Sequence, residues 1–248
     1  MTEWTHLRHT EAAAAEIGQM AEAVRGRDGT TPVPTCPGWD LRDLAEHTGA
    51  VHRWAAAMVR DAADRRYDRA AMDHGFPEDF AEAADWLEAG AVQLADALKS
   101  RDPDTEMWGW AGDRHARFWS RRQLHETVVH RADAEIALGI APRIDEDVAA
   151  DGVEEFFDVL PYARWRPRVA ELRSDGEAIS WRTGTGLAWL VRLTPKGFAY
   201  ERSDGPADVI VRAPTAGDLM LTLWNRREPD AVHGDDELLR FWRERAEI

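Results

Sequence analysis

The stretch Ser120-Arg-Arg-Gln-Leu-His-Glu-Thr-Val-Val-His-Arg-Ala-Asp-Ala-Glu-Ile-Ala-Leu138 carries a long helical pattern that stops at Gly139. Glycine often follows a helix because it accepts the left-handed backbone conformation found there. Glu126 and His130 lie four residues apart within this stretch, so their side chains are expected on one helix face, a turn apart. The sequence here predicts a helix that presents a carboxylate and an imidazole together.

Three further helical segments precede this stretch, each with apolar residues at spacings of three and four. We expect them at residues 3–25, from about Asp40 onward, and from about Pro77 to Pro103. Asp40 is a candidate N-cap, with Asp43 three residues later in the first turn. Four helices without strand patterns between them predict a four-helix bundle over residues 1–141.

The chain changes character after this point. Residues 140–147 read as a linker, and a helix is expected at Val148–Leu160, before Pro161. Short runs typical of strands then alternate with Gly- and Pro-containing turns, at Val169–Leu172, Ala178–Arg182, Leu187–Leu193, Phe198–Glu201 and Val209–Arg212. Two helices follow, at Thr215–Trp224 and from Asp235 to about Arg245. We therefore predict an α+β protein in which residues 142–248 form a small α/β domain with a mainly antiparallel sheet.

The charge balance and the cysteine count argue against several classes of protein. Lysine and arginine total 31 against 46 aspartates and glutamates, which gives a net charge of −15 over 248 residues. Such a chain is not expected to bind nucleic acid, which requires a basic face. Cys36 is the single cysteine, so an internal disulfide and a cysteine-rich zinc site are excluded. No apolar run reaches the ~20 residues of a membrane span and no secretory signal is visible, so we expect a cytoplasmic protein without a membrane partner.

Glu126 and His130 can share a metal ion if a facing helix supplies a third ligand. His47 and His52 of the second expected helix are both candidates, and on a regular helix they point about 140° apart. Two histidines and one carboxylate leave an open coordination position, as in catalytic zinc or non-haem iron sites. The alternative is an ordinary surface contact between Glu126 and His130, and the spacing does not match the motif of zinc proteases. Surface or capping positions are expected for His6, His9, His74, His115 and His233.

Three segments resemble the mycothiol-dependent maleylpyruvate isomerase family. Val33-Pro-Thr-Cys-Pro-Gly-Trp-Asp-Leu-Arg-Asp-Leu-Ala-Glu-His47 is similar to its N-terminal signature, and Arg121-Arg-Gln-Leu-His-Glu-Thr-Val-Val-His-Arg-Ala-Asp133 to its second signature. The segment from Asp208 to Arg226 looks like its C-terminal domain. The three resemblances occur in the expected order and span nearly the whole chain.

The resemblance implies a DinB-like four-helix bundle followed by a small α/β domain, and a divalent metal, usually zinc. In the family the first ligand stands eight residues after the tryptophan of the first signature, which gives His47; the other two are Glu126 and His130. Asp133 and Arg226 are expected to face the active site as catalytic residues. Simpler roles are that Asp133 only orients a ligand histidine and that Arg226 only sits near a helix C-terminus.

The same resemblance implies chemistry with an external thiol. The metal binds the thiol of mycothiol and lowers its pKa, and the thiolate attacks a small electrophile, either for cis–trans isomerisation or for S-transfer. Cys36 lies among prolines with no evident base, so it is not expected to be the nucleophile. The substrate stays open because none of four arginines aligns with the one that the isomerase uses after its second helix: Arg60, Arg65, Arg66 and Arg69.

Two other functions fit the same ligand set. A non-enzymatic protein would use it to hold a metal or a small molecule, and a metal-dependent hydrolase would activate water directly. Thiol dependence of turnover distinguishes both from a mycothiol enzyme. The oligomeric state carries no sequence signal.

Overall fold

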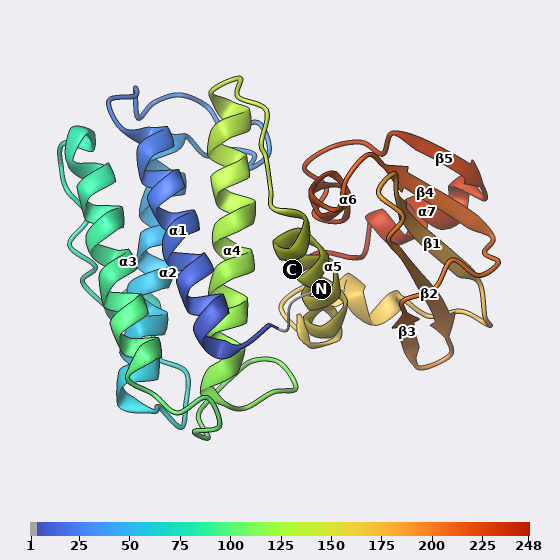
Figure 1. The fold of residues 1–248 in the computed structure, drawn as a ribbon, viewed down its shortest axis with the longest axis horizontal. Coiled ribbons are helices and arrows are strands. Elements are labelled where there is room, and N and C mark those ends of the chain that lie inside the picture. Colours follow the sequence, from blue (N-terminus) through green and yellow to red (C-terminus); the bar gives the residue numbers. More distant parts are fainter. Residues whose placement is uncertain (1–3) are drawn as a thin grey trace. The chain divides into compact units, whose positions relative to one another are not determined.

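The structure, a computed structural model, describes residues 4–248. It forms two compact units that divide between Arg143 and Ile144. The first is helical and the second combines helices with a sheet (Figure 1). Within residues 4–248, none of the helices combines the length and the apolar character needed to cross a bilayer.

Four long helices make up the first unit: α1 (His6–Val24), α2 (Leu41–Asp61), α3 (Ala83–Lys99) and α4 (Ala116–Ala137). Helix α1 packs against α3 and α4, and α2 packs against the same two helices, which closes a four-helix bundle (Figure 1). The interior is filled by small and aliphatic side chains, among them Ile17, Leu44, Leu87 and Val128. The predicted bundle is confirmed.

The start of α2 is fixed by its own sequence. The Asp40 carboxylate accepts a 2.9 Å hydrogen bond from Asp43 N, and the Asp43 carboxylate accepts one of 3.1 Å from Asp40 N. This reciprocal pair satisfies two amides that the helix itself leaves unpaired. The predicted N-cap at Asp40 is therefore confirmed.

A compact loop leads into that cap. Val33 N donates to the Trp39 carbonyl at 2.9 Å, and Trp39 N donates to the Cys36 carbonyl at 3.0 Å. Gly38 has a φ of +87°, a conformation that glycine adopts without steric cost. These bonds fix Cys36 and Trp39 just ahead of α2.

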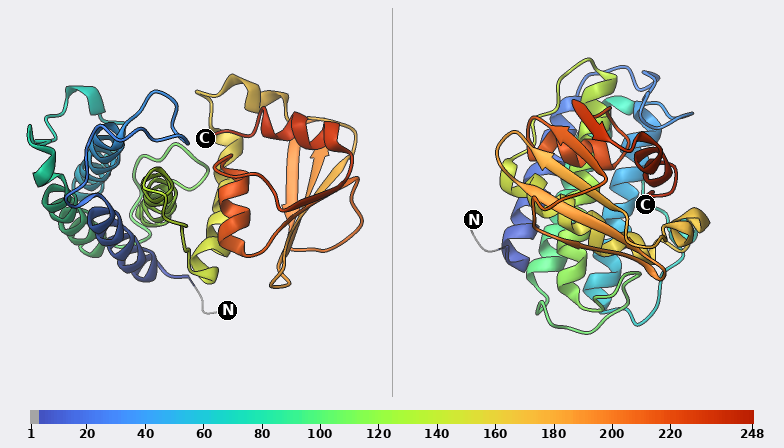
Figure 2. Two further views of the ribbon diagram at one scale, coloured as in Figure 1. Left: turned by 90° about the horizontal axis from the view of Figure 1, so that it is seen from above. Right: turned by 90° about the vertical axis from the view of Figure 1, so that its right-hand side faces the viewer.

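The second unit begins with α5 (Glu146–Val159) and contains a five-stranded sheet in the order β3-β2-β1-β4-β5. The strands are β1 (Ala178–Thr183), β2 (Ala188–Thr194), β3 (Gly197–Glu201), β4 (Val209–Ala213) and β5 (Ala231–Gly234). Only the β1–β4 pair is parallel, so the sheet is mainly antiparallel, as predicted. Helices α5 and α6 (Ala216–Leu223) pack together along one face of the sheet (Figure 2), and α7 (Asp236–Arg243) follows β5. The α+β class is confirmed.

Several predicted boundaries differ from the structure. The strand expected at Val169–Leu172 is a 3-10 helix, Pro167–Glu171, because Pro167 in the first turn favours a helical φ. Strand β5 was not predicted, since it is a four-residue edge strand without a buried alternating face. The third helix of the bundle begins at Ala83 rather than near Pro77, after the 3-10 turn Phe80–Glu82. Helix α4 begins four residues earlier than expected, because His115 makes no side-chain cap that the sequence would have revealed.

Candidate metal centre

One residue of α2 and two of α4 converge in the first unit. His47 Nε2 lies 3.6 Å from Glu126 Oε1, and His130 Nε2 lies 3.4 Å from the same oxygen. All three donor atoms lie within 4.8 Å of one another. The side chains are 24%, 21% and 11% exposed for His47, Glu126 and His130, so the cluster is neither sealed in the core nor spread on the surface.

An aromatic ring flanks the two histidines. The Trp39 ring lies 4.8 Å from the His47 ring and 6.3 Å from the His130 ring, centroid to centroid. The two imidazoles meet edge to face at 5.2 Å. The loop that carries Trp39 therefore covers part of the cluster and limits its exposure to water.

The second nitrogen of His130 is held by a buried carboxylate. His130 Nδ1 lies 2.9 Å from Asp133 Oδ2, and Asp133 is fully buried. Because an ionised carboxylate only accepts hydrogen bonds, Nδ1 carries the proton, and in the neutral ring the lone pair of Nε2 points toward Glu126. Cys36 Sγ donates to the same Asp133 oxygen at 3.4 Å. Asp133 thus lies directly behind His130, and its catalytic role stays a prediction.

The second oxygen of Glu126 is held by a buried arginine. Arg122 Nη2 donates to Glu126 Oε2 at 3.1 Å, and the Arg122 side chain is only 3% exposed. Arg122 belongs to the second signature, but the resemblance implies no role for it. The signal was present, since Arg122 stands four residues before Glu126 on the same helix face.

These contacts set the charge states of the cluster. Burial raises the pKa of Glu126, but its interactions with His130 and His47 and the charge of Arg122 outweigh burial and hold that pKa well below its usual range. Burial lowers the pKa of His130, but its interactions with Asp133, Cys36 and Glu126 raise it well above its ordinary value. The pKa of His47 is lowered, mainly by burial. An anionic Glu126 thus faces a protonated His130 and a neutral His47, so a cation that binds here must displace a proton from His130 Nε2.

The residues themselves left the choice between His47 and His52 open. The structure separates them, because His52 is fully buried and its Nε2 lies 2.9 Å from Thr127 Oγ1. Only His47 joins Glu126 and His130 within the described cluster. Of the four arginines that did not align, Arg69 is the one whose positive charge contributes to the lowered pKa of His47.

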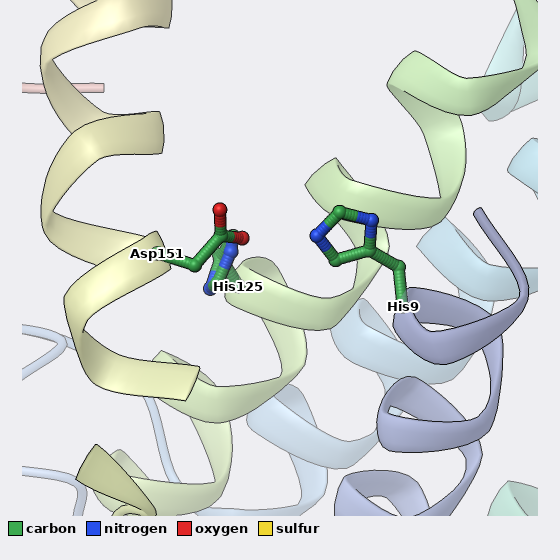
Figure 3. A group of neighbouring side chains, drawn as sticks. All are labelled: His9, His125 and Asp151. Carbon is green, nitrogen blue, oxygen red and sulfur yellow. The ribbon is translucent and has the colours of Figure 1, made fainter. Parts of the chain in front are cut away.

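His9 was expected at a surface or capping position, but the structure buries it. Its ring stacks on Trp4 at 4.9 Å and meets the buried His125 ring at 6.5 Å, nearly at right angles. Figure 3 shows His9 on α1 and His125 on α4 projecting into the same space. The helical phase of α1 turns His9 toward α4, which a single histidine near the N-terminus did not reveal.

Arg226 belongs to the second unit, just after α6. Its Nη1 donates to the Trp224 carbonyl at 3.0 Å. The structure therefore brings together His47, Glu126, His130 and Asp133, and the participation of Arg226 stays a prediction.

The donor set fits a small divalent cation. Zinc binds imidazole nitrogen and carboxylate oxygen at about 2.0–2.1 Å, so two ligands of a tetrahedral site are separated by about 3.3 Å. The observed separations of 3.4 Å and 3.6 Å from Glu126 Oε1 are close to that spacing. A second group, Cys36, Asp133 and His130, uses the other nitrogen of His130. A neutral imidazole has one lone pair, so His130 serves one of the two groups at a time.

The model of the mycothiol maleylpyruvate isomerase N-terminal domain matches residues 10–135. A crystal structure of the mycothiol-dependent maleylpyruvate isomerase superposes with a TM-score of 0.61 at 13% identity, covering 94% of this chain and 95% of that one. A mutant of that isomerase, with one histidine replaced by alanine, gives a TM-score of 0.64 at 12% identity over the same shares.

At these identities the two structures establish a shared fold. None of the curated proteins matches the chain. The family model covers half of the sequence and includes α2 and most of α4, with all three clustered residues. The chain belongs to the mycothiol maleylpyruvate isomerase family.

Proposed function

We propose that this protein is a metal-dependent enzyme that uses the thiol of mycothiol as a nucleophile toward a small electrophile. The reaction is a cis–trans isomerisation or an S-transfer, and the metal is a divalent cation, with zinc favoured. The observation that carries the proposal is the convergence of His47, Glu126 and His130 within 4.8 Å. Family membership supports the thiol cofactor.

The proposal divides the chain into a metal-binding domain, residues 1–141, and a second domain, residues 142–248. A cytoplasmic location suits it, because that compartment keeps thiols reduced. Together, a bound divalent cation and mycothiol would supply a thiolate near neutral pH, ready to attack an electrophilic carbon.

The residues of the chain have separate parts in this scheme. Three side chains donate to the cation and leave one position open for the thiol: His47, Glu126 and His130. Asp133 Oδ2 lies 2.9 Å from His130 Nδ1 and keeps the proton of the neutral imidazole on that nitrogen. The lone pair of Nε2 is then available to the cation. Arg226 would bind a carboxylate of the substrate or of mycothiol, as a guanidinium does well.

The test starts with protein purified without chelator. We expect about one equivalent of metal by elemental analysis, and a rise in melting temperature when mycothiol is added to the metal-loaded protein. That rise should vanish after metal removal and return when zinc is restored. Turnover of electrophiles such as maleylpyruvate or an alkyl halide should require both metal and mycothiol.

Three results would contradict the proposal. Protein that neither retains nor takes up a divalent cation lacks the proposed site. Hydrolysis that proceeds without any thiol identifies a metal-dependent hydrolase instead. Bound metal without mycothiol binding or thiol-dependent turnover of any electrophile identifies a binding protein.

A further inference from the structure

The two carboxylate oxygens of Glu126 face different partners. Oε1 lies 3.6 Å from His47 Nε2 and 3.4 Å from His130 Nε2, whereas Oε2 accepts a 3.1 Å hydrogen bond from Arg122 Nη2. Arg122 is therefore the group that distinguishes one oxygen from the other. Oε1 is the oxygen that faces the two histidines.

Arg122 is an unusual residue for the interior of a bundle. Its side chain is 3% exposed, and taking a guanidinium out of water is unfavourable. An apolar side chain of similar volume is often neutral or stabilising at such a position, so stability alone does not account for an arginine there. Its contact with Glu126 suggests a role in the state of that carboxylate.

We propose that Arg122 is a positioning residue, which holds Oε2 of Glu126 and presents Oε1 alone to the cation site. This inference rests on the proposed function. A carboxylate that is free to turn can bind a cation through both oxygens, which would fill the position needed by the thiol. A charge-assisted hydrogen bond to Oε2 opposes that turn. Arg122 thus keeps the donor set at three protein atoms.

The second ligand of α4 is held in the same way. His130 uses Nε2 toward the cluster, and its Nδ1 is bonded to Asp133 at 2.9 Å. Arg122, Glu126, His130 and Asp133 follow one another at spacings of four, four and three residues, so they form one column along α4. In this column an outer residue holds the spare polar atom of each ligand. Outer partners of this kind change metal affinity or activity by about 10–100-fold.

The test uses cobalt as a spectroscopic probe. Four-coordinate Co²⁺ absorbs visible light more strongly than five- or six-coordinate Co²⁺, so the absorption reports how many donors surround the ion. We expect Arg122→Met to bind Co²⁺ with weaker absorption than the wild type, because both oxygens of Glu126 become donors. Its affinity for mycothiol, measured by titration of the cobalt spectrum, should fall about tenfold or more.

Arg117→Met is the matched control. It removes another arginine of α4, whose ion pairs are with Asp113 and Asp104 rather than with the cluster. We expect this variant to keep the wild-type cobalt spectrum and mycothiol affinity. A change equal to that of Arg122→Met would reduce the effect to a general loss of helix charge and overturn the inference.

The outcomes separate this inference from the proposed function. Wild-type protein that takes up no Co²⁺ or Zn²⁺ would contradict the proposed function. If the wild type binds Co²⁺ and Arg122→Met shows the same spectrum and mycothiol affinity, Arg122 does not position Glu126. Should circular dichroism show Arg122→Met to be unfolded, Arg122→Leu replaces it, because leucine also lacks a hydrogen-bond donor. A weaker absorption and lower mycothiol affinity in Arg122→Leu support the inference, and wild-type values overturn it.

Discussion

Helices α2 and α4 meet through two histidines that are five residues apart, and the two contacts differ in kind. His47 approaches the carboxylate of Glu126 at 3.6 Å and is 24% exposed. His52 approaches the hydroxyl of the next residue, Thr127, at 2.9 Å and is fully buried. The same two helices thus form a polar contact near the surface and a neutral contact in the core.

The comparison shows that surroundings, and not residue type, decide which histidine can bind a cation. Burial lowers the pKa of His52 to about 3, and its Nδ1 has no hydrogen-bond partner among the described residues. The charge of Glu126 acts on His52 but does not outweigh burial, and among the described residues His52 joins no group that could hold a metal. His47 shares an anionic oxygen with His130, so a cation there would meet three donors and offset a negative charge.

The largest expected effect is the difference between two variants, each of which removes one of these histidines. His47→Ala should lose the bound metal and at least about 10³-fold in mycothiol-dependent kcat/KM, because one of three protein donors is gone. His52→Gln should keep a full equivalent of metal, since the hydrogen bond of His52 is to Thr127 and not to the cluster. Metal content by elemental analysis and kcat/KM are the measurements.

The reverse pattern would contradict the assignment. If His52→Gln loses the metal while His47→Ala keeps it, the cation binds deeper between the helices than the cluster indicates. Equal losses in both variants, with native circular dichroism, would mean that the two contacts act as one site. Either result would break the distinction between the two contacts.

A smaller effect is expected in the pH dependence of stability. His52 has a folded-state pKa of about 3 against an ordinary value of 6.5, so below pH 6.5 the unfolded chain binds a proton that the folded chain does not. The free energy of unfolding should therefore fall as the pH drops from 6.5 toward 3. The slope from this one group is at most about 1.4 kcal/mol per pH unit, or about 2 kcal/mol at pH 5.

Denaturant unfolding at pH 7 and pH 5 measures this contribution. The loss of stability between the two pH values should be about 2 kcal/mol smaller in His52→Gln than in the wild type, because glutamine does not titrate. Any effect of the substitution that does not depend on pH cancels, because only the change in unfolding free energy between pH 7 and pH 5 is compared. An identical loss in both proteins would show that His52 is accessible to protons in the folded state, unlike a buried contact.

The sequence revealed those parts of the site that depend on one helix. Glu126 and His130 were paired by their spacing of four residues, since helix geometry alone puts them on one face. The choice between His47 and His52 needed a resemblance, because it depends on how α2 is turned against α4, which packing decides. Arg122 shares the favourable spacing to Glu126, but the spacing did not show that the guanidinium is buried.

In the fold, too, features set within one element were predictable, and features set by packing between elements were not. The four helices of the bundle were predictable from apolar spacing, and Asp40 with Asp43 marked the start of α2. Strand β5 escaped because it pairs only with β4 at the sheet edge, without a buried face of its own. The 3-10 turn at Pro167–Glu171 resembles a strand in sequence, because its short apolar run has no period that separates the two.

The smallest expected effect concerns a contact one step removed from the ligand cluster. Cys36 Sγ donates to Asp133, which in turn holds His130, so the thiol supports a ligand without donating to it. A thiol is a weak hydrogen-bond donor, and a serine hydroxyl can take over its bond. We expect Cys36→Ser to lower mycothiol-dependent kcat/KM by less than about tenfold, against about 10–100-fold for Asp133→Asn.

A loss of about 10³-fold in Cys36→Ser would identify the thiol as a nucleophile, because hydroxyls at neutral pH are far weaker nucleophiles than thiolates. Alkylation of Cys36 gives an independent comparison, since a bulky adduct next to Asp133 should impair metal binding while the small serine should not. If Cys36→Ser keeps its activity and the alkylated protein releases its metal, the thiol matters for its size and its contact with Asp133 and not as a nucleophile. The reactive sulfur would then have to come from outside the chain, whose single cysteine is accounted for.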